Sequence, residues 1–180
     1  MSTINNQKNV KEQYANAGNL KARISIHQKY STNKMGFGNW IFSNYKIAEK
    51  YGVLKRMHVG ETGSADDIEK AIDTLGLDEI HHGINAVHSP RVMKLLADRK
   101  ITLNVCPTSN IKLGYAKSYA EHPIKILVEN GVPVTINTDD LLVFDSSIDE
   151  EYQHLYDAGT LTAEHLDEIR CWGISNRIEK

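Results

Sequence analysis

The chain has few cysteines and no long apolar run, and both features limit the classes of protein to which it can belong. Only Cys106 and Cys171 occur among 180 residues, so the sequence implies neither a disulfide framework nor a zinc cluster built from thiolates. No uninterrupted apolar stretch reaches the length of a membrane helix or of a signal-peptide core. With 41% hydrophobic residues and a net charge of −2, the sequence predicts a cytoplasmic globular protein.

Charge is unevenly distributed along the chain. Residues 1–56 hold ten Lys or Arg against two acids, a net charge of +8, whereas the remainder holds 11 against 21, a net charge of −10. A basic segment can bind nucleic acid, but this one lacks the arginine and aromatic pattern of a base-stacking surface. We therefore interpret residues 1–38, which are polar and basic without a sustained period, as a solvated or partner-facing segment and expect no nucleic-acid partner.

From residue 39 onward, helical and strand patterns alternate. Predicted strands end at His58, His82, Cys106 and Asp139, which are 24, 24 and 33 residues apart. That spacing is the length of one βα unit, and helical patterns fill the intervals. The last strand, residues 134–137, is apolar at nearly every position, as strands covered on both faces are. The pattern predicts an α/β fold with parallel strands and helical crossovers.

Polar side chains that can bind a metal or carry protons follow three of these strands. They are, in chain order, His58 and Glu61, then His82, then Asp139 and Asp140. Because the carboxyl ends of parallel strands meet at one edge of a sheet, we expect these groups to converge. Imidazole and carboxylate groups suit Zn²⁺ and leave spare groups for acid–base work. On spacing alone, surface histidines and turn acids without a shared role remain an alternative.

Four segments, HVGE, HHG, CPTSNIKLG and TINTDDLLVF, in this order resemble the adenosine deaminase family of the amidohydrolase superfamily. The resemblance covers about residues 40–178. It implies a partial TIM (β/α)8-type barrel, roughly its last four βα units, so that residues 39–180 form an adenosine deaminase-like C-terminal half-barrel. The implied activity is zinc-dependent hydrolytic deamination of adenosine to inosine and ammonia, a reaction of purine metabolism, with a purine nucleoside as the small-molecule partner.

The resemblance also implies a role for each polar residue. His58 and Asp139 would ligate zinc. Glu61 would protonate the purine ring nitrogen as water adds to the neighbouring carbon, and His82 would orient and deprotonate that water. Asp140 would hydrogen-bond the five-membered ring of the purine. We interpret His81 as structural and Cys106 as a small buried hydrophobic residue. The remaining histidines are interpreted as solvated or helix-surface residues: they are His27, His88, His122, His154 and His165.

One part of the family's zinc site has no counterpart in this sequence. The family's other two zinc ligands form a His-x-His pair on its first strand, and no His-x-His occurs here. The residues before the first predicted strand also cannot hold four further βα units. Because a catalytic zinc normally has at least three protein ligands, we do not expect the chain to act alone. A second copy, a separate N-terminal half-barrel, or His27 as a replacement ligand would complete the site; the alternative is a catalytically inactive half-domain.

Two further alternatives concern specificity and fold, and two residues depart from the family pattern. The segment TDDLLVF favours adenosine, and adenine deaminase-like specificity is the alternative. Leu141 and Glu79 depart from the family, which usually has Pro and often has Arg at these positions. A zinc fold of the cytidine deaminase type needs a Pro-Cys-x-x-Cys ligand pair, and this chain has none.

Overall fold

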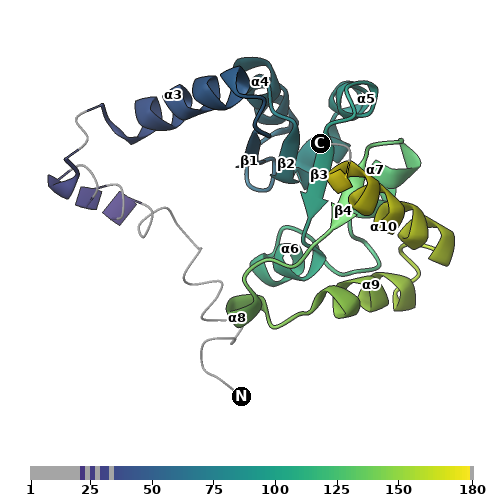
Figure 1. Cartoon of the computed structure of the whole chain (residues 1–180). Helices are drawn as coiled ribbons and strands as arrows, with labels where there is room; N and C mark the ends of the chain where they lie inside the picture. The colour runs from purple at the N-terminus through teal and green to yellow at the C-terminus, as the bar shows by residue number, and fades with distance from the viewer. Residues whose placement is uncertain (1–20, 23–24, 27–28, 33–34, 179–180) are drawn as a thin grey trace.

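The computed structural model describes residues 21–22, 25–26, 29–32 and 35–178 (Figure 1). Its centre is a sheet of four parallel strands in the order β1-β2-β3-β4, which confirms the predicted α/β fold. The strands are β1 (Arg56–Val59), β2 (Glu79–His82), β3 (Thr102–Val105) and β4 (Val134–Ile136). Because every pair of neighbouring strands is parallel, all four carboxyl ends lie at one edge of the sheet.

Helices fill the intervals between strands. They are α3 (Phe37–Lys50), α4 (Ala65–Leu75), the 3-10 helix η2 (Ile84–His88), α5 (Pro90–Asp98), α6 (Pro107–Leu113), α7 (Ile124–Glu129), α8 (Leu141–Phe144), α9 (Ile148–Asp157) and α10 (Ala163–Ile178). Figure 1 shows α3 projecting away from the sheet beside α4. The proposed replacement ligand His27 lies outside the described residues, and the domain boundary at residue 38 stays a prediction.

One face of the sheet carries the hydrophobic core. Ile80, Leu103 and Val134 point from successive strands into a cluster with fully buried residues of α4, α5 and α7, among them Ile68 and Leu96. Burial of such side chains is the main favourable term in folding, at about 25 cal/mol per Å² of apolar area. Along α4 the buried residues recur three or four positions apart, which is the spacing of one helix face.

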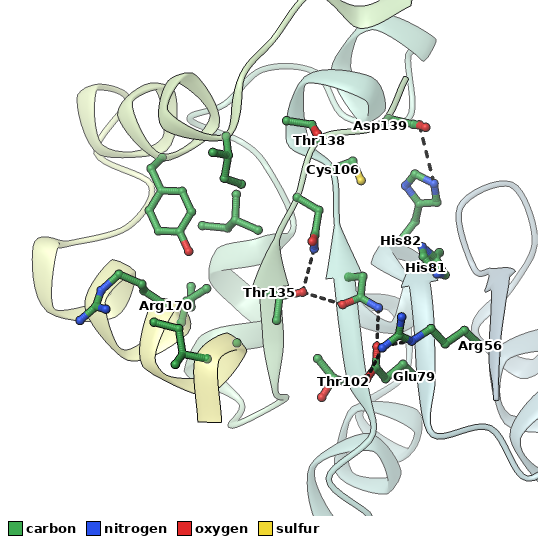
Figure 2. Close-up of a pocket in the computed structure, with 18 of the residues that line it drawn as sticks. Arg56, Glu79, His81, His82, Thr102, Cys106, Thr135, Thr138, Asp139 and Arg170 are labelled. Carbon is green, nitrogen blue, oxygen red and sulfur yellow. Dashed lines mark hydrogen bonds and ion pairs between the residues drawn. The ribbon is translucent and has the colours of Figure 1, made fainter. Parts of the chain in front are cut away.

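The opposite face of the sheet is polar and borders a cleft of about 920 Å³ (Figure 2). Arg56, Glu79, Asn104 and Thr135, one from each strand, line this cleft. Helices α9 and α10 also line it, and α10 is tied to the sheet by a hydrogen bond of 3.1 Å from Trp172 Nε1 to Thr102 Oγ1.

Local sequence signals mark the starts of three helices. Ser64 and Asp67 form a capping box at α4, and Ser147 and Glu150 form another at α9. The hydroxyl of Ser89 caps α5, which opens with a proline. Three short helices were not predicted: η2, α6 and α8.

Two glycines let the loops after β1 and β2 approach each other closely. Gly60 and Gly83 both have positive φ, 75° and 67°. A Cβ on Gly60 would lie 2.4 Å from Ile68 Cδ1, and one on Gly83 would lie 2.7 Å from Leu103 Cδ2. The HHG turn therefore requires glycine both for its backbone angles and for its packing.

We expect Gly83→Ala to destabilise the fold clearly more than Gly131→Ala does. Both positions have positive φ, 67° and 70°, so each alanine carries a backbone strain of about 1–2 kcal/mol. Only Gly83 adds a clash, because a Cβ on Gly131 meets no atom within 4 Å. Urea unfolding of the two variants measures the difference. Equal free energies of unfolding would contradict the close packing of this turn.

Candidate active site

The carboxyl edge of the sheet brings four of the predicted residues together. The ring centroids of His58 and His82 are 5.2 Å apart. His82 Nε2 lies 4.0 Å from Asp139 Oδ2, and His82 Nδ1 lies 3.3 Å from Glu61 Oε1. His82 is thus the centre of the cluster, with the other three groups around it. Figure 2 shows His82 and Asp139 facing each other across the end of the sheet.

The fifth predicted residue, Asp140, has a different local role. Its Oδ1 accepts hydrogen bonds from the backbone N–H groups of Leu142 and Val143, at 3.0 and 3.2 Å, so it caps α8. Its side chain is exposed. The structure does not bring Asp140 into the cluster, and its contact with a purine stays a prediction.

His82 is buried and held in an uncommon backbone conformation. It is 2% exposed, and its φ of 65° lies in the left-handed region. For a residue with a side chain this conformation costs about 1–2 kcal/mol, and such strain occurs preferentially at functional sites. Burial lowers the pKa of His82 to about 4, against the attraction of Asp139 for the protonated form. The imidazole is therefore neutral at neutral pH.

Glu61 has the opposite shift. Burial raises its pKa to about 7, and a hydrogen bond from Asn110 lowers it while the charge of Asp139 raises it further. A carboxyl group with a pKa near neutrality can both give and take a proton at physiological pH. The side chain is 18% exposed, so it remains within reach of a bound molecule. The geometry thus combines a carboxylic acid with a neutral imidazole.

Helix α6 supplies two residues of this cluster that were not predicted. Ser109 Oγ donates to Asp139 Oδ2 at 2.7 Å, and Asn110 Nδ2 donates to Glu61 Oε1 at 2.8 Å. The buried carboxylate of Glu151, on α9, accepts from the backbone N–H of Thr108 at 3.0 Å and so fixes the start of α6. The sequence signals for this helix are Pro107, which follows directly after a strand, and Gly114, which ends the helix.

The structure also shows the surroundings of His81 and His122. His81 stacks on His58, with ring centroids 4.7 Å apart and planes at 9°. The interpretation of His122 as solvated was wrong: it is 2% exposed and bonded to Asn110. His122 lies just before α7 and meets Asn110 of α6, 12 residues earlier in the chain, which no local pattern around His122 indicated.

The described residues fit a zinc site only in part. His58 and Asp139 flank His82, and imidazole and carboxylate are ordinary zinc ligands. In the described part of the chain, however, no group of three or more His, Cys, Asp or Glu side chains is arranged to hold a metal ion. His58 is also exposed, and no described strand pairs with the outer edge of β1. A complete metal site therefore needs donors beyond these residues.

A row of polar side chains crosses the sheet below the cluster. Arg56 on β1 pairs with Glu79 on β2 through two contacts, at 2.8 and 3.2 Å. Asn104 on β3 donates to Glu79 Oε2 at 3.0 Å, and Thr135 on β4 donates to Asn104 Oδ1 at 2.6 Å. Figure 2 shows this row below His81 and His82. Glu79, a departure from the family pattern, is thus fully paired here.

A family model described as adenosine deaminase matches residues 29–177. The chain belongs to the adenosine deaminase family. The adenosine deaminases of Shewanella loihica and Clostridium kluyveri are each 37% identical to it, over 67% and 62% of this chain. The matches take in 37% and 32% of those proteins, so the chain spans well under half the length of these curated relatives. The family is that of hydrolases acting on C–N bonds.

Solved structures agree with this assignment. The adenine deaminase of Arthrobacter aurescens is 27% identical, with a TM-score of 0.53 over 73% of this chain and 47% of that one. An amidohydrolase from Burkholderia ambifaria, solved with bound zinc, has a TM-score of 0.67 at 23% identity, over 81% of this chain and 41% of that one. The likeness to the second shows the fold alone. The sheet is accordingly part of a TIM-type barrel.

Among the described helices, none combines the length and the apolar character needed to cross a membrane.

We expect Arg56→Met to destabilise the protein by about 2–3 kcal/mol, because it leaves the buried Glu79 carboxylate with Asn104 as its remaining partner. The double variant Arg56→Met/Glu79→Gln removes both charges and keeps an amide oxygen for Asn104. It should therefore be more stable than the single variant. Urea unfolding of both variants and the parent measures this, and a double variant no more stable than Arg56→Met would contradict the pairing of the two charges.

Proposed function

We propose that this chain supplies the acid–base part of the active site of a deaminase that converts adenosine to inosine and ammonia. The observation that carries the proposal is the cluster of Glu61, His82 and Asp139, in which a carboxyl group with a pKa of about 7 lies 3.3 Å from a buried, neutral imidazole. Membership of the adenosine deaminase family supports the same chemistry.

In this proposal each residue acts on one part of the reaction. Glu61, protonated, gives its proton to the purine ring nitrogen as water adds to the neighbouring carbon. His82 orients the attacking water, and Asp139 holds it from the other side. This proton keeps the ring nitrogen neutral as the oxygen adds, where an anion would otherwise form. Of the two protons that the water loses in all, one restores Glu61 and the other leaves with the amino group as ammonia. Asp140 is proposed to contact the five-membered ring.

The metal part of the site is proposed to be shared. His58 and Asp139 contribute two zinc donors, and the remaining donors come from beyond the described residues. A second barrel half, either another copy of this chain or a separate N-terminal half-barrel, would supply them and cover the exposed His58. No step of the reaction is assigned to the metal here, because the described residues do not complete its site.

Adenosine is the proposed substrate, with adenine as the second candidate. Two relatives at 37% identity are named adenosine deaminases, and one solved neighbour at 27% identity is an adenine deaminase. The segment Asp139 to Phe144 favours the nucleoside. Competition between adenosine and adenine for turnover in one assay distinguishes them.

A non-catalytic half-domain is the second candidate function, and the incomplete donor set favours it. It keeps the same cluster but predicts no turnover under any pairing. Substitution of Glu61 would then change stability and leave every other property of the protein unaltered.

The test is conversion of adenosine to inosine by the purified chain in zinc-containing buffer, alone and mixed with a separately produced N-terminal half of the Shewanella loihica enzyme. We expect turnover in the assembled site that falls at least about 100-fold in Glu61→Gln, because a general acid contributes that much or more. His58→Ala should lose turnover by weakening the metal site. An assembled mixture, seen by co-elution, without turnover would support the half-domain instead.

A further inference from the structure

A buried chain of hydrogen bonds leads from the backbone of α7 to His82. It begins at the N–H of Ile124, which donates to His122 Nδ1 at 3.1 Å. A backbone N–H can only donate, so Nδ1 of His122 carries no proton. Burial lowers the pKa of His122 to about 4, and the neutral ring therefore carries its one proton on Nε2.

The protonated nitrogen of His122 fixes the orientation of Asn110. His122 Nε2 lies 3.3 Å from Asn110 Oδ1, so the amide oxygen must accept there. The amide nitrogen then faces the other way, 2.8 Å from Glu61 Oε1 and 3.2 Å from His82 Nδ1. Its two hydrogens meet these two acceptors. Asn110 is 0% exposed, so water offers no alternative partner to a reversed amide.

The orientation of Asn110 in turn selects the tautomer of His82. A hydrogen on His82 Nδ1 would point at the amide hydrogens of Asn110, and only Glu61 Oε1, at 3.3 Å, could accept it. With Asn110 donating, Nδ1 is an acceptor and the ring proton lies on Nε2. That nitrogen is the one facing Asp139, 4.0 Å away.

We propose that His122 and Asn110 are positioning residues that hold His82 in its Nε2–H tautomer. Neither touches the reacting atoms; each acts through the next group in the chain. The consequence for catalysis rests on the proposed function: in this tautomer His82 presents a donor toward Asp139, so it orients an attacking oxygen by donating to it and cannot take its proton. The family resemblance implied that His82 also deprotonates the water, and this tautomer removes that part of its role. The tautomer itself is a property of the chain whether or not it turns over adenosine.

The test is the tautomeric state of each histidine in the full chain, labelled with ¹⁵N-histidine and measured by long-range ¹H–¹⁵N correlation at pH 8. Loss of one signal set in His82→Asn and of another in His122→Phe assigns the two rings. We expect both rings to show an unprotonated Nδ1 and a protonated Nε2. A protonated Nδ1 on either ring in the unsubstituted chain would overturn the proposal.

The His122→Phe variant tests the dependence. Without the donor on His122, the amide of Asn110 is free to reverse, and we expect His82 to shift toward the Nδ1–H form. His88→Gln is the matched control, since His88 lies in η2 and is not part of this chain of hydrogen bonds, and it should leave the His82 signals in place. If the His122→Phe protein keeps native amide dispersion and its His82 signals do not shift, the tautomer of His82 does not depend on His122 and the proposal is refuted.

The measurement separates this inference from the proposed function. If both rings show the expected tautomers but no assembly converts adenosine, the proposed function is wrong and the positioning role of His122 and Asn110 stands. If adenosine is converted while His82 is protonated on Nδ1, the positioning role is wrong and the proposed function stands.

Discussion

The fully buried amide of Asn110 is the interaction on which the site depends. It joins α6 to Glu61, 49 residues earlier in the chain, and to His82, 28 residues earlier. An amide buried without partners costs about 1–3 kcal/mol per unsatisfied group, so the fold gains by bringing these parts together. The parallel sheet makes this feasible because its strand ends share one edge. The glycines after β1 and β2 then allow the loops to approach, and Glu151 fixes the start of α6.

The same arrangement lowers stability in two places. His82 has a left-handed backbone, and Glu61 has a pKa raised by burial from 4.5 to about 7. Since the folded pKa of Glu61 lies above the unfolded value, its contribution to stability is fully present below about pH 4.5 and is lost as the pH rises through 7. A structure selected for stability alone would avoid both features. Their presence around one buried imidazole is what a site for proton transfer requires.

Much of the fold was predictable because local signals coincided with it. The 24-residue spacing of strand ends, the capping serines at α4, α5 and α9, and the apolar spacing of α4 and α5 all agree with the structure. The convergence of His58, Glu61, His82 and Asp139 followed from parallel strands. Asn110 and Ser109 were missed because α6 is short and polar, and its role appears only in tertiary contacts. The burial of His122 was missed for the same reason, because its partner Asn110 lies 12 residues earlier in the chain.

This member of the adenosine deaminase family has a pre-assembled acid–base group whose metal donors are incomplete among the described residues. The property on which this group depends is that Glu61 is an acid near neutrality without any bound metal. The most direct measurement is the titration of the Glu61 carboxyl carbon by ¹³C NMR in the metal-free chain, with Glu61→Gln to assign the signal. The account predicts a midpoint at about pH 7. A midpoint near 4.5, the value of an unperturbed glutamate, would contradict it.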